Sequence, residues 1–130
     1  ETLAVDGSEA AAAVSRLYGA ALGRDGDIAG QTFWSGVAEA RGLAAVAEGF
    51  TGSDEFAARF GADPDHGAYI DALYREVLGR GADEEGEDFW RDALADPEVD
   101  EADLLLFFSE SDEYAERVEN SFDDGVLVFA

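Results

Sequence analysis

The residues best able to do chemistry in this sequence are acidic side chains in two glycine-containing loops. Asp25 and Asp27 have the Asp-x-Asp spacing that opens a calcium-binding loop, and a glycine follows them. The corresponding loop later in the chain keeps Asp83 and adds Glu84. Because calcium prefers carboxylate oxygens, these four residues are candidate calcium ligands.

The same acidic residues also have a structural interpretation. The twelfth position of the first loop, where a calcium loop carries a bidentate glutamate, is Gly36. Asp27 and Asp83 stand where an N-cap would open the two helices that carry the tryptophans. We favour the capping interpretation and keep calcium as the one candidate cofactor.

Three other residue types invite a functional interpretation. Arg24 and Arg80 could bind an anion, but an arginine after a helix-ending glycine more often reaches a carboxylate or the last carbonyls of that helix. Trp34 and Trp90 could stack on a ligand, yet aromatic residues at this helical spacing are mostly core residues. His66, the only histidine, follows a proline turn and is interpreted as an exposed polar residue. The sequence contains no nucleophile elbow, phosphate loop or metalloprotease motif, so we expect no enzyme.

The elements that must position these residues occur twice. Residues 17–34 recur as residues 73–90 at a constant offset of 56, and residues 50–59 recur as 108–117 at an offset of 58. Nearly all matched positions are apolar, glycine or capping residues, which build a scaffold. The repeated positions predicted to form the core are Leu17, Tyr18, Leu22, Phe33, Trp34, Leu73, Tyr74, Leu78, Phe89 and Trp90.

Apolar spacing and capping residues predict an all-α bundle of about eight short helices. Ser8 is expected to cap the first helix, which ends near Gly23, and Asp27 caps a second that Gly42 breaks. A third helix covers Leu43 to Phe50, and Ser53 caps a fourth. The later helices are predicted over residues 66–78, 84–95, 101–109 and 112–121, the third of these apolar on all sides. We divide the chain into an arm (1–10), repeat 1 (11–62), repeat 2 (63–121) and a tail (122–130), with both repeats in one domain.

Charge and composition restrict the partners. The 130 residues carry a formal net charge of −23, and all eight basic residues are arginines. Such a surface repels phosphate backbones and anionic lipids, so we expect neither nucleic acid nor a membrane as partner. Self-repulsion at this charge is relieved by salt, which suits an extracellular, saline or calcium-rich medium. Cysteine is absent, and no apolar run reaches membrane-spanning length.

The tail departs from the helical pattern. Residues 120–125 have turn composition, and an apolar, β-prone segment follows them. An exposed segment of this kind invites aggregation unless it is covered, either by docking on a neighbouring copy or by folding onto its own bundle. The residues expected to make this contact are Val126, Leu127, Val128 and Phe129.

The repeated pattern L-Y-x-x-x-L-G-R-x-x-D-x-x-G-x-x-x-W, followed by F-x-x-S-x-E-F, resembles the bacterial domain-of-unknown-function family 4214 in two tandem copies. That family occurs in type I-secreted, RTX-like surface proteins and is distantly similar to the phycobilisome linker domain. The resemblance implies an all-α fold and an extracellular or cell-surface location, and no catalytic activity is established for the family. The acidic and then apolar tail also resembles the C-terminal signal of type I export substrates.

These observations give two expectations for function. The first is a non-enzymatic, secreted structural protein that forms a homo-oligomer or filament, a surface layer or a matrix. The alternative is a calcium- or glycan-binding adhesion module at the C-terminal end of a larger RTX-like protein. A calcium titration would separate the two.

Overall fold

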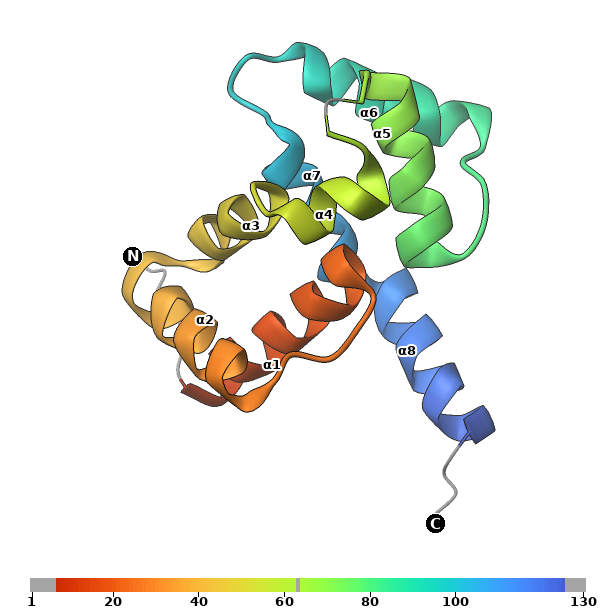
Figure 1. The fold of residues 1–130 in the computed structure, drawn as a ribbon. Coiled ribbons are helices and arrows are strands. Elements are labelled where there is room, and N and C mark those ends of the chain that lie inside the picture. Colours follow the sequence, from red (N-terminus) through yellow and green to blue (C-terminus); the bar gives the residue numbers. More distant parts are fainter. Residues whose placement is uncertain (1–6, 63, 126–130) are drawn as a thin grey trace.

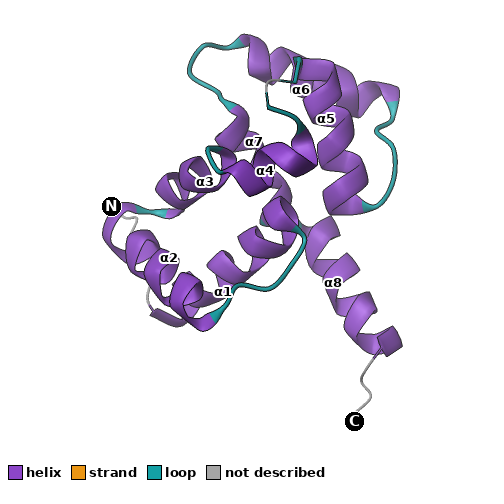
Figure 2. Ribbon diagram, viewed as in Figure 1, coloured by secondary structure: helices purple, strands orange, loops and turns teal. Residues whose placement is uncertain are grey.

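In a computed structural model, the backbone is described for residues 7–62 and 64–125 and the side chains for residues 9–62 and 64–118. Every regular element within these residues is a helix (Figure 2), which confirms the predicted all-α class. The first half contains α1 (Gly7–Leu17), the π-helical η1 (Tyr18–Leu22), α2 (Ile28–Arg41), α3 (Leu43–Thr51) and α4 (Asp54–Phe60). The second half contains α5 (His66–Leu73), the π-helical η2 (Tyr74–Leu78), α6 (Glu84–Ala95), α7 (Glu101–Ser109) and α8 (Asp112–Gly125).

The two halves meet through corresponding helices (Figure 1). Within each half, the first helix packs on the second, α1 on α2 and α5 on α6. Between the halves, α3 packs on its repeat counterpart α7, and η1 contacts its counterpart η2. Contacts between corresponding elements are those of an isologous dimer, here made within one chain. The repeats therefore share one core.

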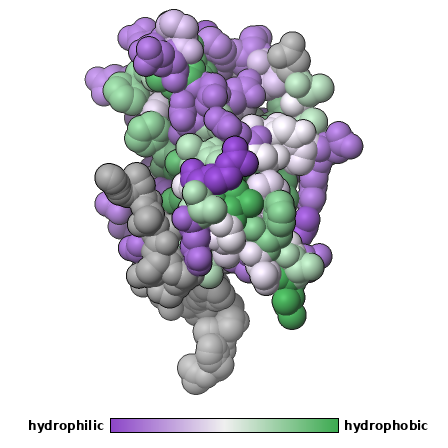
Figure 3. All heavy atoms as spheres, turned by 90° about the vertical axis from the view of Figure 1, so that its left-hand side faces the viewer, coloured by the Kyte–Doolittle hydropathy of each residue, from purple (hydrophilic) through white to green (hydrophobic). Residues whose placement is uncertain are grey.

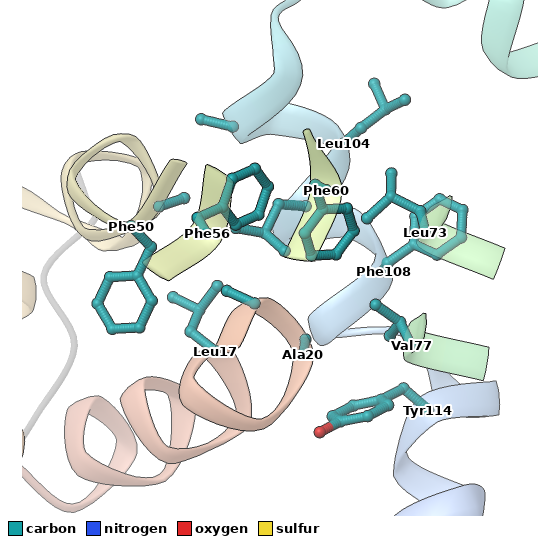
Figure 4. Packing of buried hydrophobic residues seen from close by; sticks show 14 of the residues in the cluster. Leu17, Ala20, Phe50, Phe56, Phe60, Leu73, Val77, Leu104, Phe108 and Tyr114 are labelled. Atoms are coloured by element: carbon teal, nitrogen blue, oxygen red, sulfur yellow. The ribbon is translucent and has the colours of Figure 1, made fainter. Parts of the chain in front are cut away.

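That core lies between α1, α3, α4, α5 and α7 (Figure 4). Leu17 and Leu73, which correspond in the two repeats, are both completely buried, as are Leu104 and Leu105 of the apolar helix α7. Burying a leucine side chain stabilises the folded state by about 1.5–3 kcal/mol. The buried leucines of α7 are therefore a principal source of the stability of the fold. The first- and second-half side chains seen to converge in Figure 4 are Leu17, Phe50, Phe56, Phe60, Leu73, Leu104 and Phe108.

Both π-helices end in the same way. Gly23 and Gly79 follow η1 and η2 with φ angles of 70° and 74°, a left-handed conformation that glycine adopts without steric cost. The Gly23 N–H donates to the Tyr18 carbonyl over 3.1 Å, which closes the wide π turn. The sequence predicted where these helices end, but it did not predict that the last turn widens.

The chain termini and their adjoining helices differ from prediction. Helix α1 begins at Gly7, so Ser8 lies inside the helix and does not precede it as the cap. Helix α8 continues through Gly125, where a turn was predicted from residue 120 onward. Extending an existing helix costs far less than starting one, so the weak turn preference of Asn, Ser and Asp does not end it. Residues 126–130, with the predicted docking segment, lie outside the described residues.

The core prediction is wrong for two residues. Phe33 is 61% exposed and Phe89 is 62% exposed, whereas their neighbours Trp34 and Trp90 are partly buried against the core. Adjacent residues on an α-helix point about 100° apart. Because each tryptophan faces the core, the preceding phenylalanine is turned to the surface. Leu22 and Leu78 are also only partly buried.

Candidate functional site

Arg24, the arginine that recurs in the second half as Arg80, joins three parts of the chain. Its guanidinium makes a two-pronged contact with the Glu55 carboxylate, with Nε–Oε2 and NH2–Oε1 distances of 2.6 and 2.9 Å. The same Arg24 side chain donates to the Asp25 carbonyl over 2.9 Å and lies 5.3 Å above the ring of Tyr18. The two N–H groups on one edge of the guanidinium therefore bind the carboxylate, and the flat face of the guanidinium lies over an aromatic ring.

The second half repeats this arrangement. Arg80 binds Glu113 with distances of 2.7 and 3.0 Å, donates to the Gly81 carbonyl, and lies 5.0 Å above the ring of Tyr74. Hydrogen bonding by the arginine lowers the pKa of Glu113, just as Arg24 lowers that of Glu55. The prediction that both arginines reach a carboxylate is confirmed.

The candidate calcium ligands act locally in the described structure. Asp27 and Asp83 cap α2 and α6, each accepting the backbone N–H of the glycine three residues later over 2.7 Å. Glu84 lies in the first turn of α6, and Asp25 lines a pocket between the two halves. Among the side chains of residues 9–62 and 64–118, no group of three or more acidic or histidine residues is placed to hold a metal ion. The capping interpretation is confirmed, and calcium binding stays a prediction.

The two tryptophans have different neighbours. Trp34 lies over Gly49, and a Cβ atom on that glycine would be 2.4 Å from the tryptophan ring. The corresponding position in the second half is Phe107, whose ring lies 5.7 Å from that of Trp90 and is 62% exposed. In the first half, Gly49 leaves room for the Trp34 ring, whereas the second half carries an additional exposed aromatic ring.

A groove of about 720 Å³ follows from this difference. Its apolar floor consists of Trp90, Leu106 and Phe107, from α6 and α7. Three acidic residues lie at its rim, of which two are engaged elsewhere: Glu110 binds Arg16 at 2.8 Å, and the Asp103 carboxylate accepts the Asp100 N–H. The third is Asp112, in the first turn of α8.

Comparison with known protein families assigns more than half of this chain to one family. The profile described as "Domain of unknown function (DUF4214)" matches residues 47–118, more than half of the chain. The chain belongs to the DUF4214 family. The matched stretch runs from α3 to α8 and includes both Ser-x-Glu caps but only the second Tyr-Arg cluster. No curated protein and no solved structure matches the chain.

This DUF4214 chain has a second concave surface that the sequence did not reveal. A pocket of about 560 Å³ lies where η1, α4, η2 and α8 meet, between the two halves. Four of the eight arginines line it, together with Asp25, Glu76 and Tyr114. Its four arginines are Arg24, Arg59, Arg75 and Arg117.

One signal for this pocket was present in the sequence. Tyr114 replaces the phenylalanine of the family pattern, which the first half keeps as Phe56. The Tyr114 ring packs beneath Ala20 and Val77 (Figure 4), and a Cβ atom on Gly19 would lie 2.4 Å from its hydroxyl oxygen. The extra hydroxyl therefore fits only because Gly19 has no side chain.

None of the described helices is both long enough and apolar enough to cross a membrane.

Proposed function

We propose that this protein is a non-catalytic, secreted structural protein that assembles head to tail into an extracellular filament or layer. The observation that carries the proposal is the pair of unlike apolar surfaces on the two halves. The first half presents Phe33 as a projecting ring, and the second half presents the groove at Trp90, Leu106 and Phe107. In this assembly, Phe33 of one copy enters the groove of the next.

Charge favours α2 as the projecting surface. Helix α2 contains one acidic and one basic residue, Glu39 and Arg41, whereas α6 contains five acidic residues and one arginine. In Figure 3, the coloured atoms in the centre and lower right of the face are mostly white and green, whereas those at the top are mostly purple. In a chain with a net charge of −23, α2 can approach an acid-rimmed groove with little repulsion.

The geometry of such a contact favours an open assembly. A projecting ring and a groove on different faces of one chain make a heterologous contact, which extends into a filament when the rotation between copies does not close. Screening of the remaining acidic charge makes the assembly salt-dependent, because the Debye length falls to about 8 Å at physiological ionic strength. The extracellular location is supported by the acidic, lysine-free composition of the chain.

Exposed phenylalanines in the two halves supply a matched test. Phe33→Ser and Phe89→Ser remove rings of nearly equal exposure, each in a T-shaped contact with a neighbouring tryptophan at 4.9 and 4.8 Å. Sedimentation velocity and electron microscopy at rising NaCl should show that Phe33→Ser abolishes assembly and that Phe89→Ser does not. Equal effects of the two variants, or a wild-type chain that stays monomeric in all conditions, would reject the proposal.

Mixing variants tests the direction of the contact. Phe33→Ser keeps the groove, and Phe107→Ser keeps the projecting ring. Each variant alone should be monomeric, and an equimolar mixture should give a dimer that cannot extend. A mixture that remains monomeric would show that these two surfaces do not bind each other.

The groove also supports a second candidate, a glycan-binding adhesion module. Trp90 and Phe107 offer an aromatic surface with a carboxylate rim, and such a combination suits the apolar faces and hydroxyls of a sugar. Calorimetric titration with a neutral oligosaccharide, and separately with calcium, tests this candidate. Saturable, stoichiometric binding of either probe to the monomer, lost for the oligosaccharide in Phe107→Ser, would favour the adhesion module over the structural subunit.

A further inference from the structure

The pocket between the two halves concentrates positive charge in an otherwise acidic protein. Four of its lining residues are arginines, half of those in the chain, whereas the whole chain carries 31 acidic residues. Arg24 is neutralised by Glu55, and Arg59 is neutralised by Glu76 at 2.7 Å. For Arg75 and Arg117, the structure records no carboxylate partner among the described side chains. Two guanidinium groups at one concave surface repel each other unless an anion lies between them.

The repeat explains why no carboxylate among the described side chains pairs with Arg117. Arg59 and Arg117 correspond in the two repeats, and each donates to a carbonyl of its own π-helix, at 3.3 Å to Ala20 and 2.9 Å to Val77. Arg59 also reaches across the interface to Glu76 of the other half. The residue in the first half that corresponds to Glu76 is Ala20. The carboxylate that would complete the second arginine is therefore missing from the repeat.

The backbone holds the Arg117 guanidinium in place. Its Nε and NH2 atoms lie 2.8 and 3.1 Å from the position that a Cβ on Gly79 would occupy, so the planar group rests directly on the glycine backbone. Arg59 rests in the same way on Gly23, with its Cζ 3.1 Å from the corresponding position. An arginine has five N–H donors, and the contact with Val77 uses one donor atom of Arg117. No described residue is recorded as an acceptor for its other donors, so we treat these donors as free to bind a ligand.

Tyr114 adds a neutral donor to the pocket. Burial raises the pKa of its hydroxyl, although the charges of Arg117, Arg59 and Arg16 oppose the rise. The phenol thus stays protonated at neutral pH and can donate a hydrogen bond. This hydroxyl is absent from the first half, where Phe56 occupies the corresponding position.

We propose that this pocket binds a small oxyanion, a carboxylate or phosphate group on a molecule no larger than a sugar acid. Arg117 and Arg75 supply the charge, and the Tyr114 hydroxyl supplies a third donor. The ligand group takes the place of the carboxylate that Glu76 provides on the other side of the interface. Guanidinium groups match both carboxylate and phosphate oxygens with paired hydrogen bonds. Asp25 also lines the pocket and disfavours a highly charged anion.

Titration calorimetry at constant ionic strength tests the site, with inorganic phosphate and D-glucuronate as separate probes. The wild-type chain should bind one anion per chain, and preference for one probe identifies the oxyanion class. Arg75→Gln should weaken binding by about tenfold to hundredfold, because a hydrogen bond to a charged group contributes about 1.5–3 kcal/mol. Arg41→Gln is the matched control, since it makes the same charge change at an exposed arginine outside the pocket.

Tyr114→Phe gives an independent measurement. Phe56 in the first half shows that the fold accepts phenylalanine at this position, so the variant should fold and bind the anion about fivefold to tenfold more weakly. Absence of saturable binding of both probes to the wild-type chain would overturn the proposal. So would equal weakening by Arg75→Gln and Arg41→Gln, since that result would report net charge alone. Neither result bears on self-assembly, which depends on the separate surfaces at Phe33 and Phe107.

Discussion

The two halves of this protein are nearly identical inside and different outside. The helix caps at Asp27 and Asp83 have the same 2.7 Å distance, and the arginine–glutamate pairs differ by about a tenth of an ångström. Tyr18 and Tyr74 each meet a phenylalanine of the third helix in a T-shaped contact, at 4.9 and 5.2 Å. These contacts, each made within one half, are therefore kept in both.

Two other positions differ between the halves. Gly49 corresponds to an exposed phenylalanine, Phe107, and Ala20 corresponds to Glu76, which binds across the interface. Each difference creates a surface that the other half lacks, the groove in one case and the arginine pocket in the other. A duplicated fold can thus keep the repeated contacts that hold each half together and still present a different surface on each half.

Core truncations test the equivalence of the halves and should have the largest effect. Leu17→Ala and Leu73→Ala remove corresponding, completely buried side chains, and each should lower the free energy of unfolding by about 2–5 kcal/mol. Urea denaturation followed by circular dichroism measures both. Because the halves share a core, each variant should unfold in a single transition. Two separate transitions, or a loss confined to one variant, would break the equivalence.

The Gly49–Phe107 difference is tested by two substitutions to alanine. Gly49→Ala places a Cβ against the Trp34 ring and should cost about 1–3 kcal/mol through overpacking. Phe107→Ala removes a mostly exposed ring and should cost about 0.5–1.5 kcal/mol, the usual contribution of an aromatic pair. Thermal unfolding of both variants shows which substitution lowers the stability more. The opposite order would show that Phe107 belongs to the core of the second half.

Substitution of the capping aspartates distinguishes a purely structural role from calcium binding. Asp27→Ala and Asp83→Ala each remove an N-cap and should cost about 1 kcal/mol, equally in both halves. The loss should be the same in chelator and in calcium, measured by denaturation under both conditions. A loss that appears only with calcium would support the metal-binding interpretation of these loops.

The smallest expected effect concerns the two arginine–glutamate pairs. The pKa values of Glu55 and Glu113 are lowered by hydrogen bonds from Arg24 and Arg80. Since the folded-state pKa lies below the unfolded one, the contribution of each pair is complete above the ordinary glutamate range and is lost as pH falls through the folded-state pKa. NMR titration of the carboxyl carbons should show Arg24→Gln raising the pKa of Glu55 and leaving that of Glu113 lowered. A shift at both glutamates would mean that the two clusters are coupled.

The sequence predicted most helices because their limits depend on local chemistry. Asp27, Ser53 and Asp83 cap the helices that follow them, as their spacing indicated, and Gly23 and Gly79 end the π-helices at the predicted places. The ends of the chain were predicted less well, since Ser8 and residues 120–125 lie within helices. Local turn preference at those positions is weaker than the tendency of a helix to continue.

By itself, then, the sequence determined the duplicated frame, the all-α class and the partners of its repeated capping residues, because those features depend on neighbours a few residues apart. The tertiary structure decided which aromatic side chains remain at the surface, since Phe33 and Trp34 have the same apolar character and only packing sets which one faces the core. It also brought Arg59, Arg75, Arg117 and Tyr114 together at one pocket. These residues come from α4, η2 and α8, and only the packing of the two halves against each other places them side by side.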